Sequence, residues 1–187
     1  MDHCCGEHNS GVSRGVFQTL AEMDFDRGPW SSAMNGDNQA ILKYLNDGGL
    51  PNLKDSAGYT ALHYAARNGN EEICRKLLSH GALVNATTKT GNATPLHRAS
   101  YSGHVFVVKL LLDKKADSLI QDADGQTALH KAVLGNHSEI CKLLIANNPK
   151  CKEVLDNKYK LPKDYISSSV EMSDVCKILT WKNDKAN

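Results

Sequence analysis

The sequence predicts an all-α repeat solenoid, and three observations carry that prediction. A short motif ending in histidine occurs three times, and its histidines, His63, His97 and His130, are separated by 34 and 33 residues. A glycine or an asparagine follows each histidine after six residues. A pair of large aliphatic residues follows after fourteen and fifteen residues. Because a fixed period of this length is typical of stacked helical units, we expect about three full repeats and two atypical capping repeats.

Each motif predicts a short first helix. Thr60, Thr94 and Thr127 precede these segments, and threonine caps a helix by accepting its unpaired N–H groups. The expected first helices are Ala61–Asn68, Pro95–Ser102 and Ala128–Gly135.

A second helix follows in each unit, because apolar residues recur there at helical spacing. The expected second helices are Glu71–His80, Val105–Lys114 and Ser138–Asn147. Gly69 and Gly103 supply the left-handed residue of the turn between the two helices. Asn136 replaces glycine there in the fourth unit, and asparagine tolerates that conformation best among the other residues.

The phased motifs resemble the ankyrin-repeat family, in which a β-turn finger precedes a pair of antiparallel helices. The resemblance extends over roughly 155 residues of the chain. It implies an intracellular protein without catalytic activity or cofactor. It also implies a groove, built from the fingers and the first helices, that binds another protein.

The resemblance predicts the organisation of the chain. We expect a disordered tail at 1–15, a capping segment at 16–28, a capping repeat at 29–57, full repeats at 58–90, 91–124 and 125–158, and a C-terminal capping repeat with tail at 159–187. The repeat phase reaches Trp30 at one end and Asp164 at the other.

Both ends of the array need a cover for their apolar faces. Met34, Ile41 and Leu45 are expected to face inward with Trp30. Val16, Phe17 and Leu20 lie at helical spacing and predict a short helix over the first repeat, and Glu171–Thr180 is expected to close the other end.

Two departures from the repeat are visible. The stretch Gly91–Thr94 holds one residue more than Gly58–Thr60, so the finger there should bulge. The segment Asn147–Asp156 also holds an extra residue together with Pro149, which makes a regular last finger doubtful.

Charge and hydropathy exclude several classes of function. The chain has 22 Lys+Arg and 21 Asp+Glu, a net charge of +1, so nothing global favours a nucleic acid or an anionic membrane as partner. No apolar run approaches the ~20 residues of a membrane span. The first residues lack the pattern of a secretion signal, so we expect a cytoplasmic protein with reduced thiols and access to the nucleus. We also expect the protein to be a monomer.

Eight histidines and six cysteines raise the question of a metal site. His63, His97 and His130 cannot share one ion, because equivalent residues of packed helices lie ~8–10 Å apart. We expect each to be buried and hydrogen-bonded to the turn of its own or the next repeat. His104 and His137 open the second helices and should make polar contacts there.

The cysteines also follow the repeat. Cys74 and Cys141 occupy a position held by Ile41 and Val108 in other repeats, which predicts an apolar core site. Cys151 and Cys176 lie in the irregular last part and are interpreted as ordinary thiols.

The N-terminal cluster of His3, Cys4, Cys5 and His8 remains open. Its spacing fits no closed zinc motif, so a disordered tail is the first interpretation. Metal binding is the alternative, and the chain would then be a metal carrier that uses the array for docking. Acylation of Cys4 and Cys5 lacks its usual second signal.

The first hypothesis is a non-enzymatic adaptor that binds a partner protein through the groove. Tyrosine and arginine are enriched in binding hot spots, although Tyr59 could instead only pack on its own turn. The expected groove residues are Tyr59, Arg67, Asn68, Lys89, Asn92, Arg98, Tyr101, Ser102, Asp124, Gln126 and Leu134. A mildly basic stretch is interpreted as a solvated finger or as a site for anionic partners, and it holds Lys150, Lys152, Lys158, Lys160 and Lys163. By resemblance, Asn85 is a candidate for β-hydroxylation.

Overall fold

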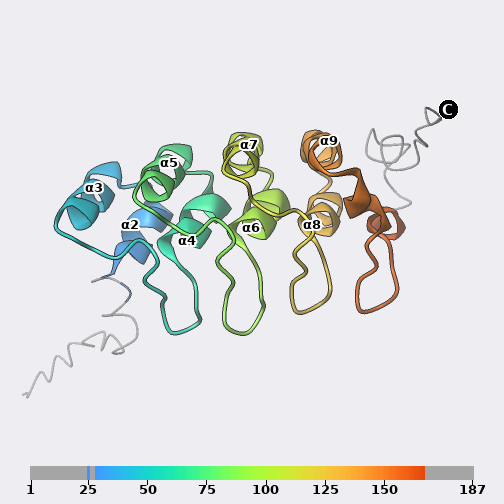
Figure 1. The fold of residues 1–187 in the computed structure, drawn as a ribbon, viewed down its shortest axis with the longest axis horizontal. Helices are drawn as coiled ribbons and strands as arrows, with labels where there is room; N and C mark the ends of the chain where they lie inside the picture. The colour runs from blue at the N-terminus through green and yellow to red at the C-terminus, as the bar shows by residue number, and fades with distance from the viewer. Residues whose placement is uncertain (1–24, 26–27, 167–187) are drawn as a thin grey trace, which may run out of the picture.

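The computed structural model describes residue 25 and residues 28–166. These residues form a row of helix pairs whose connecting loops project to one side (Figure 1). The α-helices are α2 (Pro29–Asn35), α3 (Asn38–Asn46), α4 (Ala61–Asn68), α5 (Glu71–Ser79), α6 (Pro95–Ser102), α7 (Val105–Asp113), α8 (Ala128–Leu134) and α9 (Ser138–Asn147), and the 3₁₀-helices are η1 (Pro149–Glu153) and η2 (Pro162–Tyr165). The predicted all-α repeat solenoid is confirmed.

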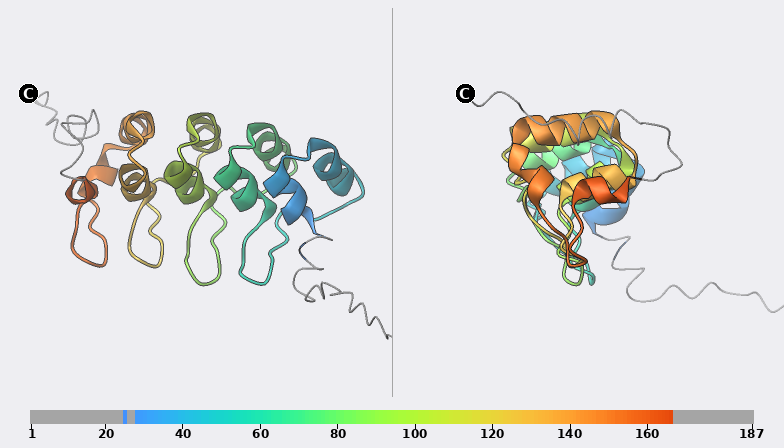
Figure 2. Two further views of the ribbon diagram at one scale, coloured as in Figure 1. Left: turned by 180° about the vertical axis from the view of Figure 1, so that it is seen from behind. Right: turned by 90° about the vertical axis from the view of Figure 1, so that its right-hand side faces the viewer.

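The helices form two rows. The inner helices α2, α4, α6 and α8 pack side by side, and each outer helix, α3, α5, α7 or α9, packs on its own inner helix. The loops that we call fingers lie at residues 52–60, 86–94, 119–127 and 153–161, and we name them by Asp55, Thr88, Asp122 and Asp156. Seen along the row, the fingers superpose as one layer that extends away from the helices (Figure 2). The surface between the inner helices and the fingers is where the groove is expected.

The predicted helix boundaries agree closely with the structure. The expected and observed ranges are identical for α4, α6 and α9. Helices α5, α7 and α8 each end one residue earlier than expected, which is within the usual spread of a helix end. The turn prediction is also confirmed, since Gly69, Gly103 and Asn136 have φ angles of 76°, 84° and 57°.

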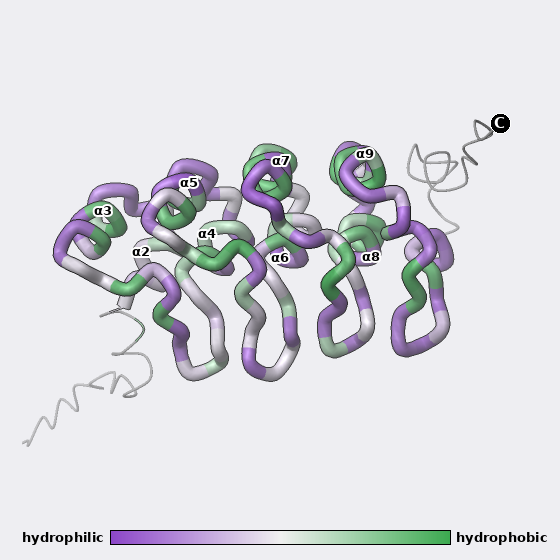
Figure 3. Tube along the Cα trace, in the orientation of Figure 1, coloured by the Kyte–Doolittle hydropathy of each residue, from purple (hydrophilic) through white to green (hydrophobic). Residues whose placement is uncertain are grey.

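The core repeats with the same phase as the motif. The side chains without exposed surface include Ala65, Ala99 and Ala132 on the inner helices and Leu77, Leu111 and Leu144 on the outer helices. The hydropathy colouring shows α7 as mainly hydrophobic and the tips of the Thr88 and Asp156 fingers as mainly hydrophilic (Figure 3). None of the described helices is long and apolar enough to span a bilayer.

The buried cysteines are core residues, as expected. Cys74 and Cys141 have no exposed surface and lie at the position of Ile41 and Val108. Burial raises the pKa of both thiols to about 12 and that of the buried Cys151 thiol to about 11. A thiol must ionise to act as a nucleophile, so these three are inert at neutral pH. Cys176 lies outside the described residues.

The expected bulge is present in the Thr88 finger. In the Asp55 finger the N–H of residue 55 donates to the carbonyl oxygen of Tyr59, four residues later. In the Thr88 finger the matching bond runs from the Thr88 N–H to the Ala93 carbonyl, five residues later. Asn92, with a φ of 47°, accommodates the additional residue.

The doubt about the last finger was wrong. The Asp156 N–H donates to the Lys160 carbonyl at 3.0 Å, and the Asp156 carboxylate accepts the N–H groups of Lys158 and Lys160. The extra residue and Pro149 are accommodated in η1, outside the finger itself. Asp164 lies at the position of the repeated histidine, and its carboxylate accepts the Leu161 N–H at 2.8 Å.

The first helix pair corrects one expectation. Trp30, Ile41 and Leu45 are buried as predicted, and the Trp30 indole N–H donates to the Leu53 carbonyl at 3.2 Å. Met34 is instead 40% exposed. It lies in phase with Tyr101, on the helix face that borders the groove, and not on the face that packs on the next repeat. The helix expected from Val16, Phe17 and Leu20, and that at 171–180, lie outside the described residues.

Candidate functional site

The three repeated histidines connect neighbouring repeats. In each, Nδ1 accepts the N–H of the threonine that begins the helix, at 3.1 Å in His63, 3.2 Å in His97 and 3.1 Å in His130. Nε2 donates to a carbonyl oxygen of the next finger, that of Ala93, Gln126 or Lys160, at 3.0, 2.9 and 3.3 Å. The prediction that these histidines are buried and hydrogen-bonded to the turn of their own or the next repeat is therefore confirmed.

Burial keeps these imidazoles neutral. It lowers the pKa of His63 to about 4, although the hydrogen bond to the Ala93 carbonyl opposes the shift. Burial lowers the pKa of His97 and of His130 in the same way. Neutral rings with one donor and one acceptor are what the observed bonds require.

The histidines that open the outer helices also bind across repeats. The Nε2 atom of His104 donates to the Arg67 carbonyl at 2.9 Å, and that of His137 donates to the Tyr101 carbonyl at 3.0 Å. The predicted polar contacts are thus present, and they satisfy carbonyl groups at the C-terminal ends of the preceding inner helices.

A carboxylate organises three of the four fingers. One oxygen of Asp55, Asp122 or Asp156 accepts two backbone N–H groups of its own finger. The other oxygen faces the following inner helix or η2. There Asp55 accepts the Tyr64 hydroxyl at 2.7 Å, Asp122 pairs with Lys131 Nζ at 2.6 Å, and Asp156 accepts the Tyr165 hydroxyl.

The Thr88 finger has no such carboxylate. The Thr88 hydroxyl accepts the Ala93 N–H at 3.1 Å. It thus replaces the aspartate oxygen that binds the finger backbone, but not the oxygen that faces the following helix. Arg98, at the helix position of Tyr64 and Lys131, has no ion-pair partner among the described residues. Its guanidinium carbon lies 5.0 Å from the centre of the Tyr59 ring, and its Nη2 donates to the Tyr59 hydroxyl.

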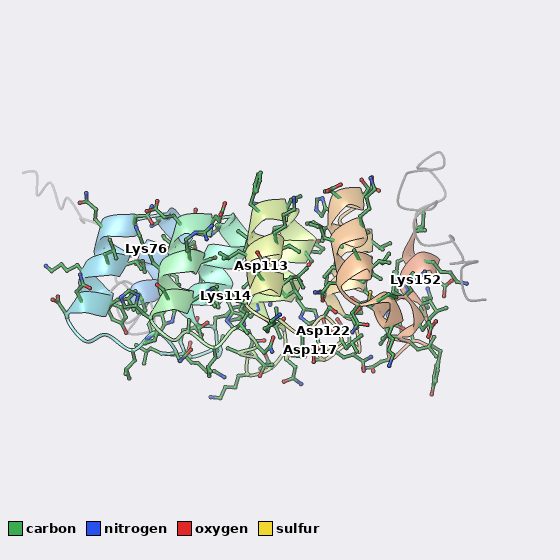
Figure 4. The ribbon with its side chains drawn as sticks, turned by 45° about the horizontal axis from the view of Figure 1, so that its top comes forward. Lys76, Asp113, Lys114, Asp117, Asp122 and Lys152 are labelled. Atoms are coloured by element: carbon green, nitrogen blue, oxygen red, sulfur yellow. The ribbon has the colours of Figure 1, made fainter. Side chains whose placement is uncertain are left out.

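A cavity of about 290 Å³ lies in the groove between the Thr88 and Asp122 fingers. Arg98, Tyr101, Lys131 and Leu134 line it from α6 and α8. The fingers contribute Gly91, Ala93, Asp122, Ala123 and Asp124. Figure 4 shows Asp122 on the finger side of the molecule, away from Lys76 on outer helix α5.

The cavity belongs to a stripe of exposed side chains along the inner helices. Met34, Tyr101 and Leu134 are in phase and are 40%, 59% and 42% exposed. Arg67, at the same position of α4, is also exposed. Three of these four repeats therefore present a large apolar or aromatic side chain to the groove.

The structure brings four of the predicted groove residues together in the cavity, namely Arg98, Tyr101, Asp124 and Leu134. Lys89 and Asn92 are exposed on the Thr88 finger, and Ser102 is half-buried at the end of α6. Asn68 is exposed, and its amide donates to the Met34 carbonyl at 3.0 Å.

Two expectations about the groove surface change. Gln126 is only 7% exposed, because its side chain accepts from Lys131 Nζ at 2.7 Å and so lies beneath the groove. Tyr59 is half-buried, and its ring packs against Tyr64 and His63 as well as beneath Arg98. The main function of Tyr59 is therefore to orient Arg98, and its own ring contributes little to the surface of the groove.

Sequence reasoning missed Asp122 and Lys131 as groove residues. The signal was available, because Lys131 is in phase with Arg98, and Asp122 is in phase with Asp55. Of the residues at this helix position, the sequence predicts only Arg98 as a groove residue, because lysine is not among the types enriched in binding hot spots.

The candidate modification site is accessible. Asn85 is exposed, and its side-chain oxygen accepts the Asp117 N–H at 3.0 Å. Asn52, one repeat earlier, accepts the Leu83 N–H at 2.7 Å in the same way. β-Hydroxylation of Asn85 stays a prediction.

The structure describes no metal site in residue 25 and residues 28–166, where no three His, Cys, Asp or Glu side chains converge. The N-terminal cluster of His3, Cys4, Cys5 and His8 lies outside these residues.

Comparison with known families shows where this architecture belongs. A family model described as ankyrin repeats (3 copies) matches residues 29–122 and, in an overlapping second match, residues 86–156. The chain belongs to the ankyrin-repeat family. Ankyrin repeats generally mediate protein–protein interaction, which fits a groove with exposed side chains and a hydrogen-bonded scaffold beneath it.

Two curated ankyrin proteins are similar in sequence. Human ankyrin repeat domain-containing protein 39 is 53% identical over 66 residues, which are 35% of this chain and 36% of that protein. The same-named protein of Bos taurus is 52% identical over 66 residues, again 35% of this chain and 36% of the relative. The chain spans about a third of the length of the curated relatives it matches.

Proposed function

We propose that this chain is a non-enzymatic adaptor that binds another protein through the groove between its inner helices and fingers. The observation that carries the proposal is the cavity between the Thr88 and Asp122 fingers. There the exposed Tyr101 and Leu134 side chains lie beside the charged Arg98 and Lys131. Aromatic and arginine side chains in a pocket that a partner can dehydrate are the usual source of binding energy in interfaces.

The scaffold of the groove supports the same proposal. Each of the last three fingers donates a backbone hydrogen bond to the preceding one: Lys89 to Ala57 at 3.1 Å, Ala123 to Gly91 at 2.9 Å and Asn157 to Asp124 at 3.0 Å. The histidine contacts join the same fingers to the inner helices. A surface that is already ordered loses little conformational entropy when a partner binds.

We also propose a cytoplasmic location with access to the nucleus. The three buried cysteines in the described residues, Cys74, Cys141 and Cys151, are all unpaired thiols. Unpaired thiols are typical of reducing compartments, which favours this location.

The double substitution Tyr101→Ala with Arg67→Ala tests the groove. We expect it to reduce capture of partner proteins from a cell lysate at least tenfold, because two exposed side chains of hot-spot type are removed. The thermal unfolding midpoint should stay within about 2 °C, since both side chains are exposed and touch little of the core.

The outer helices offer a matched control. Phe106 is 71% exposed on α7, and Arg75 is exposed on α5, so Phe106→Ala with Arg75→Ala removes an aromatic and an arginine outside the groove. This variant should capture partners as well as the wild type. Undiminished capture by the groove variant, or equal loss in both variants, would contradict the groove assignment.

A further inference from the structure

Among the residues that the structure describes, no carboxylate pairs with Arg98. The equivalent Lys131 pairs with Asp122 at 2.6 Å, and the equivalent Tyr64 and Tyr165 carry no charge yet still contact a finger aspartate. Arg98 instead stacks on Tyr59 of the preceding finger, and the finger of its own repeat, the Thr88 finger, supplies a hydroxyl in place of a carboxylate. The repeat that holds the only arginine among these four positions is thus the repeat that lacks the aspartate.

The guanidinium of Arg98 is held in place without being neutralised. It stacks over the Tyr59 ring, donates to the Tyr59 hydroxyl and is half-buried. Its Nε atom is buried and has no hydrogen-bond partner within the described part of the chain. Partial burial strengthens the attraction of such a charge for an incoming carboxylate, because there is less water to screen it.

The other charges of the cavity leave this attraction in place. Asp122 is engaged by Lys131 and by two N–H groups of its own finger. Asp124 lies 3.9 Å from Lys131 Nζ, so the negative charges gather at the Asp122 finger. Arg98, for which residues 28–166 supply no ion-pair partner, lies on α6 next to the exposed Tyr101.

We propose that this cavity binds an acidic side chain of the partner protein, with a large apolar side chain beside it. The carboxylate pairs with Arg98, and the apolar side chain packs on Tyr101 and Leu134. Arginine suits this function because its planar guanidinium binds a carboxylate with two parallel hydrogen bonds. The inference rests on the proposed groove function and specifies the chemistry of the partner.

One substitution neutralises Arg98 without removing it. Thr88→Asp places a carboxylate where Asp55 and Asp122 stand in their own fingers, and its first oxygen can still accept the Ala93 N–H. We expect Thr88→Asp to fold with an unchanged or higher unfolding midpoint and to bind acidic ligands at least tenfold more weakly. Thr88→Asn is the matched control, because it has the same shape without the charge and should bind normally.

The probe is a phage-displayed library of random 12-residue peptides, selected on the whole wild-type protein. We expect the recovered peptides to contain an Asp or Glu within two residues of Leu, Ile, Met, Phe or Trp. Synthetic versions should bind the wild type and Thr88→Asn. They should bind Arg98→Gln, Thr88→Asp and their own Asn or Gln counterparts at least tenfold more weakly.

The outcomes separate this inference from the proposed function. Peptides without an acidic residue that lose affinity with Tyr101→Ala would keep the groove and overturn the carboxylate pocket, as would acidic peptides that bind Thr88→Asp within twofold. Peptides that bind wild type and Tyr101→Ala equally would contradict both. Recovery of no peptide would also count against both.

Discussion

Replacement of His97 by alanine is expected to lower the free energy of unfolding by about 3 kcal/mol. His97 lies in the middle of the row, where its ring joins Thr94 at the start of α6 to the Gln126 carbonyl of the Asp122 finger. The ring is 3% exposed, so its removal leaves a buried N–H and a buried carbonyl without partners, in addition to a void. Urea unfolding followed by circular dichroism measures the loss.

His104→Ala provides the comparison. His104 also donates to a carbonyl of the preceding repeat, but its ring is half-buried and water can replace the bond to Arg67. We expect a loss of about 1 kcal/mol there. If His97→Ala lowered the free energy of unfolding no more than His104→Ala does, the claim that the buried histidines couple neighbouring repeats would be wrong.

Acidification from pH 6.5 to pH 4 is expected to destabilise the fold by about 3 kcal/mol through His63 alone. Burial lowers the pKa of His63 to about 4 in the folded chain, whereas the unfolded chain keeps the ordinary value of 6.5. The unfolded state therefore binds protons more readily in this range. The stabilisation is complete above pH 6.5 and is lost as the pH falls toward 4. His97 and His130 act in the same direction.

The Asp156 carboxylate titrates below this window. Burial opposes ionisation of Asp156, but the hydrogen bonds from Tyr165, Lys160 and Lys158 outweigh it and hold its pKa well below the usual range. The free energy of unfolding, measured in urea at steps of pH, should therefore fall mainly with the histidines. His63→Gln should have a shallower slope, and a free energy that stays constant between pH 6.5 and 4.5 would refute the assignment.

The repeat phase made the scaffold predictable. Helix starts follow from Thr60, Thr94 and Thr127, because each threonine must be outside the helix to cap it. The buried identity of Cys74 and Cys141 follows from the aliphatic residues that replace them in other repeats. Such positions are determined by contacts that every repeat makes, so a period in the sequence is enough to locate them.

Other features arise from differences between repeats, which a period cannot supply. Met34 is apolar and was expected to face the core, but its phase is that of Tyr101, and the phase decides its exposure. The last finger forms despite Pro149 because the additional residue is taken up in η1. The unpaired charge of Arg98 becomes visible only when the contacts of Asp55, Asp122 and Asp156 are known, since they show what Thr88 lacks.

Amide hydrogen exchange, measured with and without a bound partner that the groove variant fails to capture, tests the groove most directly. Binding should slow exchange at residues 91–93 and 122–125 and in the C-terminal turns of α6 and α8. The outer helices α5, α7 and α9 should exchange at unchanged rates. Slowed exchange confined to those outer helices, with unchanged rates between the Thr88 and Asp122 fingers, would contradict the proposal that this groove is the binding surface.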